Sequence, residues 1–180
     1  APLVLVEFTD YQCPYCARHV GAVMPQIQKN YVDTGMLRDV LRDFPLPFHK
    51  QAGKASEAAL CAGDQGKYWE MNEILFDNQR KMSDDDLRAY ASEIGLDTGK
   101  FNTCLEQKDF AEQLGKDIEE GREMGVSGTP SFVLGITDSE NPDKVHVTRF
   151  VRGARNYDAF AKEIDELLAG DGEVKAEASP

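Results

Sequence analysis

The spacing of apolar positions predicts strands at both ends of the chain and helices between them. Residues 3–8 read LVLVEF, an apolar run broken by one acid, which is typical of a buried strand. Residues 37–44 alternate and stop at prolines, which predicts a second strand. Between the two, apolar residues recur at helical spacing from Cys13 to about Asp33, and Pro25 is expected to kink that helix.

The middle of the chain has the helical period throughout. Helices are predicted over 52–62, 67–79, 83–94, 97–104 and 110–124. Strands return over 131–134 and 145–151, with a polar turn over 138–144 between them, and a last helix is predicted over 156–168. The order is therefore βαβ, a helical block, then ββα.

This order predicts an α/β fold, a mixed sheet flanked by helices on both faces. A βαβ unit gives parallel strands through a right-handed crossover, and the later hairpin adds antiparallel ones. The helical block is too long to be a loop, so it is expected to be an inserted all-helical subdomain. We assign 1–48 and 126–170 to the sheet domain, 49–125 to the insertion and 171–180 to a disordered tail.

Charge and hydropathy exclude some classes of partner. The net charge is −12 at pH 7, so nucleic acid and anionic membrane surfaces are poor candidates. No apolar run approaches the 18 or more residues of a membrane span. The chain opens at Ala1 directly into a strand pattern, with no secretory signal visible, although such a signal is removed from mature proteins.

The four cysteines allow three pairings. Cys13 and Cys16 are close enough along one helix start to reach each other, which leaves Cys61 with Cys104 as a structural disulfide. The alternative is that Cys61 and Cys104 are two separate buried thiols. An even count in which all four can pair favours an oxidising compartment.

Cys13-Pro14-Tyr15-Cys16 is the motif that carries chemistry. Proline is favoured at the first helical position, so the Cys13 sulfur is expected at the N-terminus of a helix, where unpaired N–H groups favour the thiolate. Cys16 lies one turn deeper on the same face, where it can resolve a mixed disulfide. A metal site, with His19 as a third ligand, is the competing hypothesis, but the other two cysteines lack the paired spacing of a zinc site.

Glu7 is the one acid in the first strand. Its functional interpretation is a proton acceptor beneath the cysteine pair, because exchange through Cys16 requires a proton to leave and return. The alternative is a strand-end acid that reaches water. Trp69 and Phe76 are expected to be core residues, His49 to be structural, and His19 to have a surface or packing role.

Four segments together resemble the DsbA-like branch of the thioredoxin superfamily: VEFTDYQCPYC (6–16), RDFPLPFH (42–49), ALCAGDQGKYWEM (59–71) and GVSGTPSFVLG (125–135). The resemblance implies a thioredoxin-like domain interrupted by a helical one. It also implies that Cys13 attacks substrate, that Cys16 is buried, and that a cis Thr129-Pro130 bond faces them. Glu7 falls where relatives keep a buried acid.

Two features depart from the family pattern. Pro14-Tyr15 is similar to the dipeptide of glutaredoxins, whereas the best-known DsbA has Pro-His, and this dipeptide tunes thiolate stability. Relatives also carry a strand before the redox strand, so either the sheet is short or the chain has been trimmed.

The function expected from this resemblance is an extracytoplasmic dithiol oxidase, in the bacterial periplasm or at the cell surface. It would act on reduced or misoxidised proteins, which lie against Pro14, Tyr15, Thr129 and Pro130, and a membrane-bound partner would reoxidise it. No metal and no cofactor beyond the Cys13–Cys16 disulfide are expected, and the protein is expected to be a monomer. The alternatives are a reductase or isomerase of the same fold, or a non-enzymatic metal- or peptide-binding module.

Overall fold

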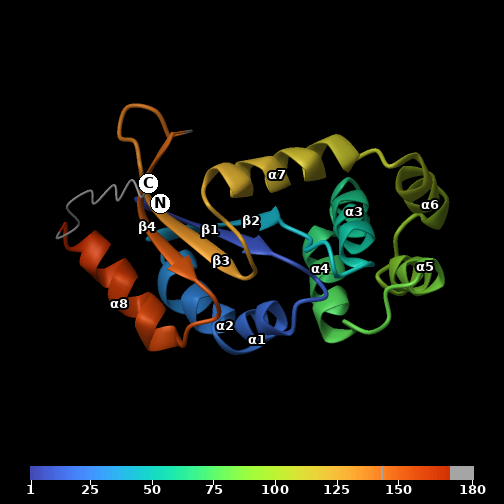
Figure 1. The fold of residues 1–180 in the computed structure, drawn as a ribbon, viewed down its shortest axis with the longest axis horizontal. Helices are drawn as coiled ribbons and strands as arrows, with labels where there is room; N and C mark the ends of the chain where they lie inside the picture. The colour runs from blue at the N-terminus through green and yellow to red at the C-terminus, as the bar shows by residue number, and fades with distance from the viewer. Residues whose placement is uncertain (143, 171–180) are drawn as a thin grey trace.

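The computed structural model describes residues 1–142 and 144–170, so the tail predicted over 171–180 lies outside the described residues. The elements, in chain order, are β1 (Leu3–Thr9), α1 (Pro14–Ala22), α2 (Met24–Ile27), the π-helical turn η1 (Gln28–Val32), β2 (Leu37–Asp43), α3 (Ala52–Gly63), α4 (Tyr68–Asp77), α5 (Asp84–Glu93), α6 (Thr98–Gln107), α7 (Ala111–Glu123), β3 (Ser131–Thr137), β4 (Val145–Arg152) and α8 (Tyr157–Leu168). In Figure 1, α1, α2 and α8 lie on one side of the sheet, α7 lies on the other, and α3 to α6 are grouped beyond one end of the strands.

One mixed sheet forms the centre of the described part of the chain, with the strand order β2-β1-β3-β4. β1 pairs with β2 in parallel, and β3 is antiparallel to both β1 and β4. The predicted mixed sheet with helices on both faces is therefore confirmed. Side chains alternate along β1, so Leu3, Leu5 and Glu7 share one face while Phe8 points to the other.

Each face of the sheet buries its own apolar cluster. Under α2, η1 and α8, the strand residues Leu5 and Phe132 pack against Ile27 and Phe160. On the other face, Phe8 and Phe44 pack beneath α7, and their rings meet edge to face at 6.2 Å. Gly121 of α7 allows this close approach, because a Cβ there would lie 2.7 Å from the Phe44 ring.

The helical block has a core of its own, built from α3 to α6 and containing residues such as Met71, Leu87 and Phe101. Both Cys13 and Cys16 belong to the same cluster, so the start of α1 packs against this block. Helix α7, in contrast, lies along the sheet in Figure 1. The assignment of 49–125 to one inserted subdomain stays a prediction.

The bounds of some elements differ from the prediction. The helix predicted from Cys13 to Asp33 is interrupted at Val23, because Pro25 has no N–H to donate and its ring crowds the preceding turn. The strand predicted over 131–134 continues to Thr137 through a bulge at Leu134/Gly135. Glycine is required at that bulge, since a Cβ on Gly135 would collide with the Val145 side chain. The helix predicted over 97–104 runs one turn further.

The expectation that Trp69 is a core residue is wrong. Its side chain is 59% exposed, whereas Phe76, from the same helix, is buried as expected. Trp69 lies in the first turn of α4, and helical side chains point back toward the N-terminus, so its ring extends past the end of the packed core.

Candidate active site

The Cys13 sulfur lies at the N-terminus of α1, where the C-P-x-C spacing places it. Cys13 is the N-cap residue, with φ −79° and ψ 118°, and Pro14 occupies the first helical position. The Cys13 thiol donates to the backbone oxygen of Thr129 at 3.4 Å, across 116 residues of sequence. Cys16 has no exposed surface, and both cysteines are free thiols here. The two predicted redox cysteines and the predicted Thr129-Pro130 loop therefore lie next to one another.

The site separates the acidities of the two thiols. The pKa of Cys13 is lowered to about 5, chiefly because the Cys16 thiol donates to its sulfur and, beyond that, because of the side-chain hydroxyl of Thr129 and the backbone N–H groups of Cys16 and Tyr15. Burial opposes this shift without overcoming it. The pKa of Cys16 is raised far above that of an ordinary thiol, first by burial and then by the Cys13 sulfur. At neutral pH the pair is therefore a thiolate on Cys13 and a thiol on Cys16.

The residues expected to contact substrate surround Cys13. The Thr129–Pro130 peptide bond is cis, the isomer implied by the resemblance. Pro130 is buried at the start of β3, and its carbonyl accepts a hydrogen bond from the N–H of Gly153 at 2.9 Å. Tyr15, by contrast, is 57% exposed, and the Arg18 guanidinium lies over its ring, 5.2 Å from the centroid.

Glu7 is fully buried on β1, so the alternative in which it reaches water at a strand end is wrong. The pKa of Glu7 is raised to about 8, chiefly by burial and then by the neighbouring Asp39 carboxyl, while the Thr9 hydroxyl acts in the opposite direction. Neither Glu7 oxygen has a hydrogen-bond partner among the described residues. Glu7 also lines a hollow of about 860 Å³, bordered by Asp39 of β2 and Trp69 of α4.

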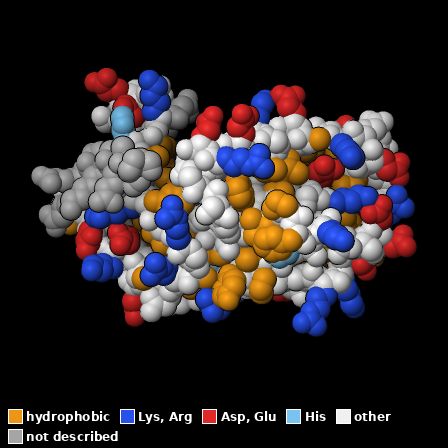
Figure 2. All heavy atoms as spheres, viewed as in Figure 1, with side chains coloured by type: hydrophobic (Ala, Val, Ile, Leu, Met, Phe, Trp, Pro, Cys, Tyr) orange, Lys and Arg blue, Asp and Glu red, His pale blue; other side chains and the backbone are white. Residues whose placement is uncertain are grey.

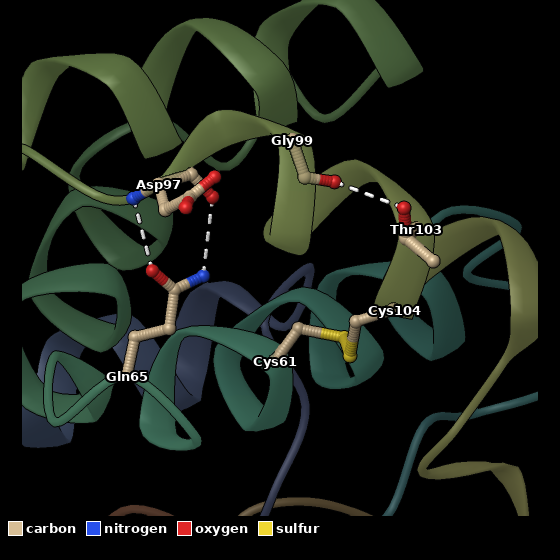
Figure 3. The surroundings of a disulfide bond; sticks show 6 residues. All are labelled: Cys61, Gln65, Asp97, Gly99, Thr103 and Cys104. Atoms are coloured by element: carbon tan, nitrogen blue, oxygen red, sulfur yellow. Dashed lines mark hydrogen bonds between the residues drawn. A yellow bond between two sulfur atoms is a disulfide. The ribbon is translucent and has the colours of Figure 1, made fainter.

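Cys61 of α3 and Cys104 of α6 form a disulfide with their Cα atoms 6.0 Å apart, as the sequence predicted (Figure 3). Beside it, the side-chain amide of Gln65 pairs with the backbone of Asp97, accepting from its N–H at 2.9 Å and donating to its oxygen at 3.3 Å. The bridge therefore joins α3 to α6, and the amide pair joins the turn after α3 to the N-cap residue of α6.

Sequence reasoning gave no role to Asp10, whose buried carboxylate organises the loop before Cys13. It accepts hydrogen bonds from the N–H of Gln12 and the N–H of Leu46, both at 2.7 Å, and contacts the His49 ring at 2.8 Å. This last contact supports the structural role predicted for His49. An acid directly after a strand and three residues before the cysteine was the available signal.

Gln79 was missed as well, and the sequence carries no signal for it. Its side-chain amide donates to the backbone oxygens of Tyr11 at 2.9 Å and Cys13 at 2.8 Å. Gln79 follows α4, so the helical block itself holds the backbone of the redox loop.

The part of the chain that the structure describes contains neither a cluster of metal-ligating side chains nor a helix suited to span a membrane. No group of three or more His, Cys, Asp or Glu side chains gathers there in a way that could hold a metal ion. None of the helices within residues 1–142 and 144–170 combines the length and apolar character needed to cross a bilayer.

Comparison with known proteins places this geometry in a family. Residues 1–152 match the model of a family described as thioredoxin. BdbD from Bacillus subtilis in its oxidised form has a similar structure, with 25% identity, a TM-score of 0.78 and coverage of 94% of this chain and 89% of that one. The α-DsbA1 protein of Wolbachia pipientis shares the fold, with 24% identity, a TM-score of 0.78 and coverage of 94% and 87%.

Curated relatives carry a different kind of name, that of Na(+)/H(+) antiporters. The Na(+)/H(+) antiporter NhaA 1 of Salinispora arenicola is 33% identical over 171 residues, which is 94% of this chain but 24% of the antiporter. The chain thus spans about a quarter of that protein's length, and the antiporter name describes the longer protein. Family match, fold and the meeting of Cys13, Cys16 and Thr129 agree: the chain belongs to the thioredoxin family and has the DsbA-like thiol–disulfide oxidoreductase fold.

Proposed function

We propose that this protein is a dithiol oxidase, which passes its Cys13–Cys16 disulfide to reduced proteins outside the cytoplasm. The observation that carries the proposal is the Cys13 sulfur at the α1 N-terminus, with a pKa lowered to about 5. A stabilised thiolate favours the reduced form of the pair, and a pair whose reduced form is stable is a strong oxidant. The Cys61–Cys104 bridge supports an oxidising compartment.

The chemistry balances without a further cofactor. A substrate thiolate attacks Cys13 Sγ, the Cys13–Cys16 bond breaks, and Cys16 leaves with the electron pair and takes up one proton. A second substrate thiolate then attacks the substrate sulfur of the mixed disulfide, and Cys13 leaves as a thiolate. The substrate is oxidised by two electrons and the Cys13–Cys16 pair is reduced. A membrane-bound oxidant that accepts these electrons completes the proposed cycle.

The surface around Cys13 suits an unfolded protein as substrate. Figure 2 shows hydrophobic side chains gathered between the sheet and the helical block, where Figure 1 places the start of α1. Tyr15 is exposed beside Cys13, and Phe48, which is 72% exposed, belongs to the loop that Asp10 holds through His49. An extended peptide that pairs with the backbone at Thr129 would bring its apolar side chains to this surface.

The redox potential and its pH dependence test the proposal. We expect a potential less negative than about −180 mV, the value of protein disulfide isomerase. Below the Cys13 pKa of about 5, reduction of the disulfide takes up two protons, so the potential should fall by about 60 mV for each unit by which the pH rises. Above that pKa, reduction takes up one proton, and the potential should fall by about 30 mV per unit. Equilibration with glutathione buffers between pH 4 and 8 gives both values.

The other outcomes identify the alternatives. A potential near −270 mV, as in thioredoxin, would contradict the oxidase and favour a reductase. No exchange with glutathione at any pH, together with bound metal in the purified protein, would favour a non-enzymatic binding module.

Glu7 is proposed as the group that exchanges a proton with Cys16. We expect Glu7→Gln to slow the step in which Cys16 attacks a Cys13 mixed disulfide by about 10²-fold, the lower end of general acid–base effects. The step is observed as the concentration-independent phase when reduced protein is mixed with excess oxidised glutathione. The carboxyl is protonated at neutral pH because its pKa is raised to about 8, so an amide should replace it without unfolding the protein.

Stability provides an independent check on the same variant. The raised pKa means that the folded state holds a proton that the unfolded state releases, so Glu7 lowers stability progressively from about pH 4.5 to 8. Glu7→Gln should remove that decline in the free energy of unfolding, which chemical denaturation at several pH values measures. Glu112→Gln, whose side chain is 82% exposed, is the matched control and should change neither measurement. An unchanged Cys16 step in Glu7→Gln would assign Glu7 a structural role.

A further inference from the structure

His19 is a fully buried residue whose polar atoms have no hydrogen-bond partner among the described residues. It projects from α1 toward the sheet, where its ring packs against Phe132 at 4.5 Å and Phe160 at 5.2 Å. Both of its nitrogens lack a hydrogen bond. An imidazole enclosed by two phenylalanine rings is costly unless its nitrogens are satisfied, and an apolar side chain would fill the same space at less cost. Packing alone therefore does not account for histidine at this position.

The His19 ring approaches the carboxyl of Glu7. His19 Nε2 lies 3.6 Å from Glu7 Oε2, just beyond hydrogen-bond length, and both Glu7 oxygens are also without a hydrogen bond. A slightly shorter contact would give one polar atom of each group a hydrogen bond. Two buried polar groups that face each other, with no other hydrogen-bond partner in the described structure, form a pair.

We propose that His19 is a positioning residue which shares the proton of Glu7, so that the Glu7–His19 pair, rather than Glu7 alone, exchanges a proton with Cys16. This inference rests on the proposed function of the redox pair. When Cys16 leaves as a thiolate, Glu7 gives up its proton to that sulfur, and the remaining carboxylate accepts a hydrogen bond from His19 Nε2–H. In the reverse direction the carboxylate takes the proton from Cys16, and the hydrogen bond is released.

The charged and titratable groups around the pair are consistent with one shared proton. Burial lowers the pKa of His19 to about 4 and raises that of Glu7 to about 8, so at neutral pH the imidazole is uncharged and the carboxyl keeps its proton. Asp39 faces Glu7 from β2, Cys13 and Cys16 face it from the start of α1, and the Tyr68 hydroxyl of α4 interacts with its charge. β3 and α8 contribute the apolar rings of Phe132 and Phe160 to the His19 side of the pair.

The test measures how the Cys16 step depends on pH, by mixing reduced protein with excess oxidised glutathione from pH 6 to 10. His19→Phe keeps an aromatic ring against Phe132 but cannot donate to Glu7. We expect its rate at pH 7 to be about tenfold lower and its profile to move up by about one pH unit, because the carboxylate forms less readily. His19→Gln can still donate and should retain a profile close to that of the unchanged protein.

A double variant separates proton sharing from packing. In Glu7→Gln, the further change His19→Phe should have no additional effect on the Cys16 step, because His19 acts only through Glu7. His146→Phe is the matched control, since His146 is exposed and paired with Asp138, and its profile should not move. If His19→Phe does not fold, His19→Met replaces it as the apolar variant.

The possible results distinguish the two proposals. An unshifted profile in the apolar variant, equal behaviour of the Gln and apolar variants, or a full additional loss in the Glu7→Gln background would each overturn the inference about His19. If Glu7→Gln itself leaves the Cys16 step unchanged, the proposed role of Glu7 fails first, and the role of His19 fails with it. A slow step in Glu7→Gln with no shift in His19→Phe refutes His19 alone.

Discussion

Replacement of Cys13 by serine is expected to abolish oxidation of a reduced peptide. The Cys13 sulfur is the one held at the α1 N-terminus beside the Thr129 carbonyl, with a pKa lowered to about 5, and a hydroxyl cannot take its place as an attacking or leaving group at neutral pH. The measurement is the oxidation of a peptide with two thiols, detected as loss of free thiol. With Cys13→Ser, this oxidation should proceed only at the uncatalysed rate.

Replacement of Cys16 by serine should give the opposite result, a stable complex. Cys13 can still attack a disulfide, but no second thiol lies beneath it to resolve the product, so a mixed disulfide through Cys13 should accumulate. Non-reducing electrophoresis followed by mass spectrometry identifies the linked cysteine. The double variant Cys61→Ala/Cys104→Ala is the control and should still oxidise peptide while it is folded. Normal turnover in Cys16→Ser, or a link through another cysteine, would contradict the assigned roles.

Loss of the Cys61–Cys104 disulfide is expected to have the largest effect on stability. The bridge closes a sequence separation of 43 residues, which corresponds to about 4 kcal/mol in the chain-entropy model. Such a change is a large part of the stability of an ordinary domain. The Cys61→Ala/Cys104→Ala variant should therefore unfold at a much lower denaturant concentration than the unchanged protein.

Two measurements control this prediction. Reduction of the unchanged protein should lower its stability by a similar amount, whereas Cys13→Ser/Cys16→Ser should keep its bridge and remain stable. Mass spectrometry of that second variant, alkylated without reductant, should find no labelled thiol. Two labelled thiols would show that Cys61 and Cys104 are not joined.

The fold could be predicted from sequence because its signals are local. The apolar run of β1, the helical spacing in α5 and the caps Ser83 and Asn156 each follow from a few neighbouring residues. The position of Cys13 at a helix start likewise needs only the following proline. The predicted end of β3 was wrong because a distant element determines it: the bulge at Gly135, through which β3 continues, depends on pairing with β4.

The environment of the redox pair could be predicted only in part. That Glu7 is an acid in an apolar strand was visible, but whether it reached water depended on how helices were placed over it. His19 fits the helical spacing, but nothing near it in the sequence points to Glu7, because their approach results from packing α1 against β1. Gln79 lies 66 residues from Cys13, beyond any pattern in the sequence.

The hydrogen bonds from Gln79, and the shared core of the helical block with Cys13 and Cys16, link the chemistry to local unfolding. Transient opening of the block would release the redox loop and expose the Cys16 thiol to solvent. The rate at which an alkylating reagent modifies Cys16 in the reduced protein is then a direct gauge of that opening. Mutations deep within α3 to α6, far from any sulfur of the pair, would thereby alter how readily Cys16 is lost to irreversible modification.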